Sequence, residues 1–162
     1  MQTETSSRAI LVPLDESNAS KNVFKWTLEN IVRDGDKLHL FHVVKPGQRY
    51  WVATGLMMDE VTDDDDVAVN LKNVEHAKQY LTTEFATKLE ELKIPYQIEI
   101  VRFARDADSI GSVICKRADE LNAVMTVMAK HTKGHLQEFF VGSVATYCTH
   151  NARTPVMVLH VD

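Results

Sequence analysis

The sequence lacks the features that mark proteins of nucleic acids, membranes or oxidising compartments. Its 162 residues carry a net charge of −5 without a run of five basic residues, so nucleic acid and anionic membranes are poor candidates as partners. No apolar run approaches the length of a membrane span. Residues 1–7 are polar, and we expect a disordered tail there, no signal peptide and a cytoplasmic protein.

Common catalytic and metal-binding patterns are missing as well. No GxxxxGKS/T or GxGxxG motif supports a P-loop hydrolase or a nicotinamide dehydrogenase, and no GxSxG elbow positions a serine nucleophile. His131 and His135 lack the intervening glutamate of HExxH. Cys115 and Cys148 fall on separate predicted helices without the spacing of a metal knuckle, which favours two buried thiols in a reducing compartment. We expect no catalytic residue and no metal site.

What is present is a regular alternation of apolar and amphipathic segments. Apolar runs predict strands over residues 9–14, 37–44, 96–103, 123–128 and 156–161, and helical spacing predicts helices over 19–32, 69–93, about 106–121 and 143–152. Either Asp106 or Asp108 is expected to open the third helix. The order predicts one α/β domain over residues 8–162, with a parallel sheet covered on both faces. The alternation of polar and apolar residues in the third strand places it near a sheet edge.

A long insert separates the second strand from the second helix. A connection as long as residues 45–68 is usually a lid, a binding loop or a disordered insertion. Tyr50 and Trp51 are too apolar for a purely solvated segment and are interpreted as covering a pocket or a partner surface. The four aspartates at 63–66 lack the alternation and the glycine of a calcium loop, so they are interpreted as a solvated acidic tip.

Two polar loops, at residues 13–17 and 129–142, follow apolar strands. Because ligands of open parallel sheets sit beyond the carboxyl ends of the strands, these loops are the expected walls of a binding crevice. Gly142-Ser143 begins a helix, whose free N–H groups and positive dipole end attract phosphate. Ser143 is expected to cap that helix or to donate its hydroxyl to a phosphate, whereas an ordinary strand-to-helix connection is the alternative. Asp15 is expected to cap the first helix, to hydrogen-bond a ribose or adenine, or both.

Three stretches resemble the universal stress protein family: ILVPLDES, HVV, and VMAKHTKGHLQEFFVGSVATYCTHNARTPVMVLH. The resemblance runs from Arg8 to Val161, and the closing pattern of GSVA, NA and PV is its most specific part. It implies a doubly wound five-stranded parallel sheet in the order 3-2-1-4-5, the adenine nucleotide α-hydrolase-like fold. It also implies a nucleotide site between the first and fourth strands and a homodimer that pairs through the C-terminal strand. The insert is similar to that of the longer plant and other eukaryotic members rather than to the short bacterial ones.

The family's ATP motif consists of a glycine, two residues, a second glycine, nine residues, and then Gly-Ser or Gly-Thr. The corresponding positions are Ala129, Thr132 and Gly142-Ser143, so the spacing is kept while both early glycines are replaced. Thr132 is unfavourable if the loop needs a positive φ there, since β-branched residues rarely adopt it. Residue by residue, the resemblance implies a nucleotide site composed of Pro13, Leu14, Asp15, Val43, Met128, Ala129, Thr132, Gly142, Ser143, Val144 and Ala145.

These residues support three hypotheses. In the first, the protein binds ATP, ADP or AMP, with or without Mg²⁺, as a stress-response sensor or switch without catalytic activity, and cations such as Lys130 offset the lost glycines. In the second, the loss of both glycines, at Ala129 and Thr132, has left a dimeric interaction protein without nucleotide that recognises unknown protein partners. In the third and weakest, the protein cleaves ATP to AMP, although the Ser-Gly-Gly-rich loop of such enzymes is missing after the first strand.

Overall fold

Five parallel strands form the centre of the molecule. The structure is a computed structural model that describes residues 7–44, 63–102, 109–130 and 142–160, with the backbone alone over 63–70. The strands are β1 (Ala9–Pro13), β2 (Lys37–Val44), β3 (Tyr96–Arg102), β4 (Met125–Lys130) and β5 (Val156–His160). They pair in parallel in the order β3-β2-β1-β4-β5, which confirms the predicted topology. The direction in which the chain adds strands reverses between β1 and β4.

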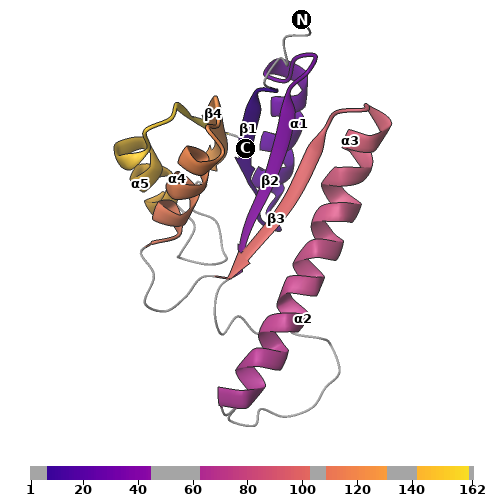
Figure 1. The fold of residues 1–162 in the computed structure, drawn as a ribbon, viewed down its shortest axis with the longest axis vertical. Helices are drawn as coiled ribbons and strands as arrows, with labels where there is room; N and C mark the ends of the chain where they lie inside the picture. Colours follow the sequence, from indigo (N-terminus) through magenta and orange to yellow (C-terminus); the bar gives the residue numbers. More distant parts are fainter. Residues whose placement is uncertain (1–6, 45–62, 103–108, 131–141, 161–162) are drawn as a thin grey trace, which may run out of the picture.

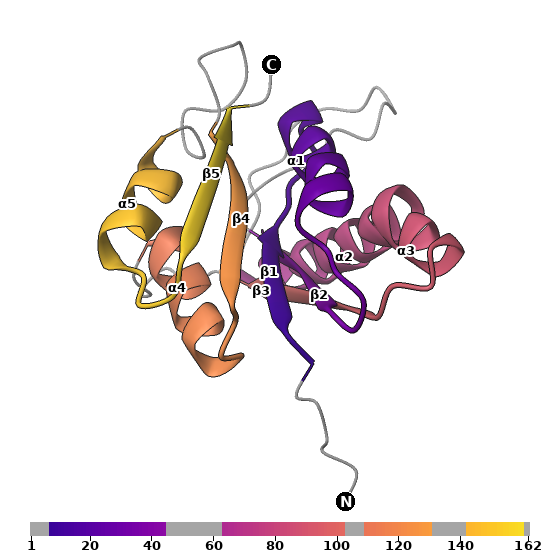
Figure 2. The ribbon, with the colours of Figure 1, turned by 90° about the horizontal axis from the view of Figure 1, so that it is seen from above.

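Helices cover both faces of this sheet. They are α1 (Asn18–Asn30), α2 (Asp63–Leu81), the π-helical turn η1 (Thr82–Ala86), α3 (Thr87–Glu91), α4 (Ile110–Glu120) and α5 (Ser143–Asn151). In Figure 1 the continuous rod of α2, η1 and α3 runs beside β3. Figure 2 shows α1, α2 and α3 on one side of the sheet and α4 and α5 on the other. The predicted doubly wound α/β arrangement is therefore confirmed.

The core has one apolar cluster on each face of the sheet. Side chains alternate along β1, so Ile10 and Val12 pack into the cluster on the α1 side and Leu11 packs into the cluster with α4 and α5. All three are fully buried, as expected for a continuous apolar run in a central parallel strand. Phe85 of η1 completes the α1 side, with its ring centroid 4.9 Å from that of Phe24 in a T-shaped contact.

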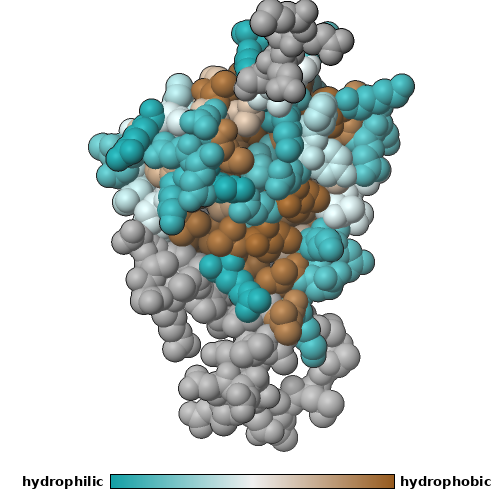
Figure 3. Space-filling view, in the orientation of Figure 1, coloured by the Kyte–Doolittle hydropathy of each residue, from teal (hydrophilic) through white to brown (hydrophobic). Residues whose placement is uncertain are grey.

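The outer strands β3 and β5 are only half-buried. β3 occupies one edge of the sheet, as its alternation predicted, and carries the half-buried apolar residues Ile98, Ile100 and Val101. Figure 3 shows apolar surface gathered where β3 and α2 lie side by side in Figure 1. β5 forms the opposite edge, and its residues 156–159 are half-buried as well. Neither edge is covered by a further strand in the described part of the chain.

The second helix begins earlier than predicted. α2 starts at Asp63, so the aspartates at 63–66 belong to a helix and the interpretation as a loop is wrong for these residues. Carboxylates in the first turn of a helix interact favourably with the positive end of its dipole. A run of aspartates is therefore compatible with the first turn of a helix as well as with a solvated loop. Residues 45–62 of the insert, including Tyr50 and Trp51, lie outside the described residues.

The same helical rod contains a π-helical turn that a period of 3.6 residues does not predict. Leu81, Phe85 and Leu89 are four residues apart, a spacing that drifts by about 40° per step around an ideal α-helix. The wider turn η1 absorbs this drift and keeps all three side chains buried. Within it, the Thr87 N–H donates to the Thr82 carbonyl, five residues earlier in the chain.

The start of α4 also differs from the prediction. Ser109 is the N-cap, and its hydroxyl oxygen accepts the Ser112 N–H. Asp106 and Asp108 lie outside the described residues, and neither opens the helix. Serine and aspartate cap helices almost equally well, so a stretch that contains both leaves the start ambiguous from sequence.

β4 ends two residues later than predicted, at Lys130. The apolar run stops at Met128, but β5 continues to pair with β4 beyond it: Ala129 pairs with Leu159 and Lys130 with His160. The length of a strand depends on its neighbour as much as on its own apolar residues. Ala129, assigned to the phosphate loop by spacing, is therefore a residue of the sheet.

Candidate functional site

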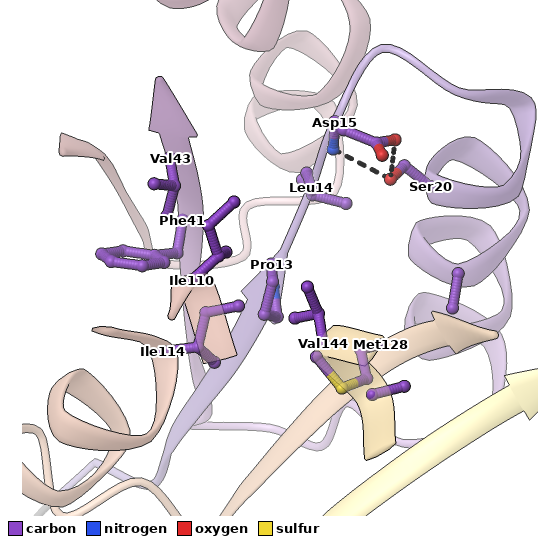
Figure 4. A pocket seen from close by; sticks show the side chains of 12 residues that line it. Pro13, Leu14, Asp15, Ser20, Phe41, Val43, Ile110, Ile114, Met128 and Val144 are labelled. Atoms are coloured by element: carbon purple, nitrogen blue, oxygen red, sulfur yellow. Dashed lines mark hydrogen bonds between the residues drawn. The ribbon is translucent and has the colours of Figure 1, made fainter. Parts of the chain in front are cut away.

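A cavity opens at the carboxyl ends of β1 and β4, where the strand order reverses. About 450 Å³ of space lies among its lining side chains, with the open solvent at its mouth included. Figure 4 shows side chains from β1, β2, β4, α1, α4 and α5 converging on it. The residues that line it are Pro13, Leu14, Asp15, Ser20, Phe41, Val43, Ile110, Ile114, Met128, Ala129, Val144 and Ala145.

Most of the predicted site residues are brought together here. Those that line the cavity are Pro13, Leu14, Asp15, Val43, Met128, Ala129, Val144 and Ala145. Gly142 and Ser143 directly precede the last two at the start of α5 but do not line the cavity themselves. Thr132 lies outside the described residues.

Four lining residues were not predicted, among them Phe41, Ile110 and Ile114. Phe41 precedes Val43 by two residues, and alternate residues of a strand share a face, so the period of the strand could have indicated it. Ile110 and Ile114 are about one helical turn apart on the predicted inner face of α4. Nothing in the sequence tells which strands that face covers.

The loop between β1 and α1 is held by its own hydrogen bonds. The Asp15 carboxylate accepts the Ser17 N–H at 2.9 Å and the Ser20 hydroxyl at 2.7 Å, while Ser20 Oγ accepts the Asp15 N–H at 2.9 Å. Ser17 is the N-cap of α1, and its hydroxyl oxygen accepts the Ser20 N–H. The prediction that Asp15 caps this helix is therefore wrong. Asp15 supports the turn instead, and its carboxylate is held in one orientation at the cavity wall (Figure 4).

A buried histidine anchors the same loop from β2. His42 Nδ1 lies 2.7 Å from the Leu14 carbonyl oxygen. A carbonyl can only accept a hydrogen bond, so Nδ1 is the donor. The Leu14 N–H donates to the Phe41 carbonyl at 2.8 Å, which extends the β1–β2 pairing by one residue. Both the N–H and the carbonyl of Leu14 are thus hydrogen-bonded to β2 at the cavity wall.

Gly142 sets the direction in which α5 leaves the cavity. It is the N-cap, with φ 82° and ψ −40°, a conformation that L-residues rarely adopt. A Cβ at Gly142 would meet nothing within 4 Å, so the backbone alone requires glycine. Ser143 is the first helical residue, and the predicted cap by its side chain is wrong. The first-turn N–H groups and the positive end of the α5 dipole therefore lie beside Val144 and Ala145 at the cavity.

Sequence comparison agrees with this arrangement. A family model described as the Universal stress protein family matches residues 6–160. The chain belongs to the universal stress protein family. Universal stress protein PHOS32 of Arabidopsis thaliana is 26% identical over 97% of this chain, which spans 66% of that protein, slightly less than two thirds. A universal stress protein A-like protein of the same plant is also 26% identical, over 88% of this chain and 79% of its own length.

Solved structures of universal stress proteins share this fold. UspA of Lactobacillus plantarum has a TM-score of 0.69 at 19% identity, covering 94% of this chain and 97% of its own. A family protein from Arabidopsis thaliana with AMP bound has a TM-score of 0.60 at 21% identity, covering 96% and 92%. The Archaeoglobus fulgidus protein in complex with dAMP has a TM-score of 0.53 at 20% identity, covering 93% and 96%.

Away from the cavity, this universal stress protein has two thiols between α4 and α5. Cys115 and Cys148 are free and buried, as predicted, and they interact with each other. Burial raises the pKa of both thiols. Within the described ranges, no three His, Cys, Asp or Glu side chains gather as a metal site requires. None of the described helices has the length and apolar character needed to cross a membrane.

Proposed function

We propose that this universal stress protein binds an adenine nucleotide in the cavity between β1 and β4 and acts as a stress-response sensor or switch rather than a catalyst. The observation that supports this most directly is that eight residues implied by the family's ATP site line one cavity, although they come from four separate segments. Family members solved with AMP and with dAMP make adenine nucleotides the ligand class to test.

The chemistry of the cavity suits such a ligand. Val43, Ile114 and Met128 offer an apolar surface for a flat base, and the Asp15 carboxylate offers acceptors to donors of the base or ribose. The helix start at Gly142 offers N–H groups to phosphate. AMP, ADP and ATP all have a flat base for the apolar side chains and phosphate for the start of the helix. ADP and ATP would carry Mg²⁺ on their phosphates.

The motif substitution at Ala129 is compatible with nucleotide binding. Ala129 is a strand residue paired with Leu159, and it packs against the core cluster on the α1 side. Alanine adopts a strand conformation without strain, so this position does not need glycine. Ala129 also packs against the core and therefore does not present its whole side chain to the cavity. The second motif glycine is replaced by Thr132, which lies outside the described residues. This replacement favours the second candidate, an interaction protein of the same fold without nucleotide.

Nucleotide release and thermal shift test the proposal together. Protein purified without added nucleotide is denatured, and the supernatant is separated on a nucleotide-resolving column. The folded protein is melted with Mg-ATP, AMP or, as a control, GMP. We expect adenine nucleotide in the supernatant or a higher Tm with an adenine nucleotide, because a ligand that binds only the folded state stabilises it. An empty supernatant and an unchanged Tm with ATP and AMP would refute nucleotide binding.

A matched pair of variants links the signal to this cavity. Ala145→Leu adds bulk at a buried position in the cavity wall, whereas Thr146→Leu changes the adjacent exposed position of the same helix. We expect A145L to lose the adenine-dependent rise in Tm and T146L to keep it. A rise that persists in A145L would mean that the nucleotide binds elsewhere.

We also propose that the protein is a cytoplasmic homodimer that pairs through β5. This strand is an edge of the sheet, and its residues 156–159 are all apolar. An unpaired apolar edge favours pairing with another strand. His160→Pro removes a backbone N–H at the end of this edge. Light scattering is expected to give twice the monomer mass for the wild type and a lower mass for the variant, and a monomeric wild type would contradict the proposal.

A further inference from the structure

The α4 wall of the cavity is held against α5 by close packing. Gly111 of α4 lies beneath Tyr147 of α5, and a Cβ on Gly111 would stand 2.7 Å from the Tyr147 ring. The Cys148 thiol lies 3.6 Å from the Gly111 carbonyl oxygen at the same crossing. The first turns of α4 therefore cannot come closer to α5.

An ion pair fastens α4 to the β2–β3 half of the sheet as well. Arg117 of α4 reaches the edge strand β3, where its Nε donates to the Glu99 carboxylate at 2.7 Å. Arg117 follows Ile114 by three residues and Ile110 by seven, which places all three on one face of the helix. Ile110 and Ile114 project from this face into the cavity (Figure 4). The ion pair thus acts on the same helical face that forms the cavity wall.

A buried histidine lies beside this ion pair. His39 Nε2 is 2.6 Å from the same Glu99 oxygen that accepts Arg117, and the His39 side chain is 2% exposed. His39, Phe41 and Val43 follow one another at intervals of two along one face of β2, and Phe41 pairs in register with Glu99. The cluster around Glu99 therefore continues the row of β2 side chains that lines the cavity.

The charges around Glu99 come from three elements. Besides Glu99's own strand β3, these elements are α4 and β2: Arg117 faces Glu99 from α4 and His39 faces it from β2. The positive charge of Lys37, also on β2, contributes to lowering the pKa of His39. Glu120 of α4 accepts Arg117 Nη1 at 3.0 Å. Burial lowers the pKa of His39 although Glu99 opposes the effect, so the histidine is neutral near pH 7 and Arg117 is the cation that balances Glu99. Without the Glu99 charge, this cluster has no ion pair between α4 and β3.

We propose that Glu99 and Arg117 are positioning residues that set the distance between α4 and the β2–β3 half of the sheet and thereby shape the ligand cavity. Neither side chain lines the cavity, so both act through Ile110 and Ile114. Loss of the pair releases the wall from the sheet, and the bound ligand must then order it again at the expense of affinity. The consequence for binding rests on the proposed function.

Two isosteric substitutions separate this role from a general effect of charge. Glu99→Gln removes the carboxylate that ties α4 to β3, whereas Glu120→Gln removes the other carboxylate on Arg117, which belongs to α4 itself. Affinity for AMP is measured by calorimetry well below the Tm of each protein. We expect E99Q to bind AMP about tenfold more weakly and E120Q to stay within about twofold of the wild type. Equal affinities in all three proteins would overturn the inference.

Amide hydrogen exchange provides a readout that needs no nucleotide. In E99Q we expect amides 110–114 of α4 to exchange at least about fivefold faster while amides 10–12 of β1 keep their rates, because the lost tie is local. Unchanged exchange in α4 would overturn the inference, and so would equal acceleration in β1, which indicates a global loss of stability. If the wild type binds no AMP, the proposed function fails, and the exchange rates alone decide the role of Glu99.

Discussion

Replacing Gly142 with alanine changes the backbone energy of the crevice without creating a steric contact. Its φ of 82° is unfavourable for alanine, while an added Cβ would meet nothing within 4 Å. Backbone strain of this kind costs about 1–3 kcal/mol. Gly35, in the turn before β2, is a matched control because it has φ 85° and equally open surroundings. It lies near the amino end of β2, whereas the cavity lies at the carboxyl ends of the strands.

Both variants are expected to lose about 2 kcal/mol of unfolding free energy. With a urea m value of about 2 kcal/mol per M, this lowers the unfolding midpoint by about 1 M. Affinity for AMP then separates the two. Gly142→Ala is expected to weaken binding about tenfold, because the first turn of α5 no longer presents its N–H groups at the cavity, whereas Gly35→Ala keeps the wild-type affinity.

Two results would refute this reasoning. A Gly142→Ala protein with the wild-type midpoint would mean that the positive φ at this position carries no strain. Equal AMP affinities in the Gly142 and Gly35 variants would mean that the start of α5 contributes nothing to the ligand. Calorimetry at several protein concentrations, with the folded fraction checked by circular dichroism, keeps loss of binding distinct from loss of folded protein.

Three further predictions concern packing and protonation. Gly111→Ala is expected to lower the unfolding free energy by about 1–3 kcal/mol, because its Cβ would stand 2.7 Å from the Tyr147 ring and 2.8 Å from the Tyr147 Cβ. Urea titration measures this loss, and a variant as stable as the wild type would contradict the prediction. Since burial raises the pKa of Cys115 and Cys148, a thiol reagent at about pH 8 is expected to label them slowly until urea unfolds the chain, and rapid native labelling would disprove their burial. Burial lowers the pKa of His39 below its ordinary value of 6.5, so the unfolded chain binds more protons than the folded one as the pH falls through that value. The unfolding free energy should therefore decline from about pH 7 to about pH 5, and less steeply in His39→Gln. Parallel pH profiles of the two proteins would argue against a neutral buried ring.

The sheet and the centre of the crevice could be anticipated from local patterns. A continuous apolar run marks β1 as central, and the alternation in residues 96–103 marks β3 as an edge, because burial on two faces or one dictates these patterns. The strand order came from resemblance to a family and is confirmed. Pro13, Leu14 and Met128 line the cavity because the residues at the carboxyl ends of neighbouring parallel strands meet at one edge.

Features that depend on partners far away in the chain could not be anticipated. The tie between Glu99 and Arg117 joins an edge strand to a helix, and nothing in the spacing of 18 residues indicates it. Ser109 was missed as a cap because two aspartates before it are equally good candidates. The turn η1 contains Phe85, which packs in the core against Phe24, and such a tertiary contact is not visible in a helical period.

The two edges of the sheet differ in what they offer to another molecule. Along β3, Gln97, Glu99 and Arg102 interrupt the apolar residues, and Glu99 is already held by Arg117. Along β5 the residues 156–159 carry no polar side chain. If only the β5 edge pairs with another strand, while the polar side chains of β3 disfavour pairing there, each molecule can add a single neighbour through its sheet. Under the proposed pairing through β5, association through the sheet would close at two copies and would not propagate into a fibre.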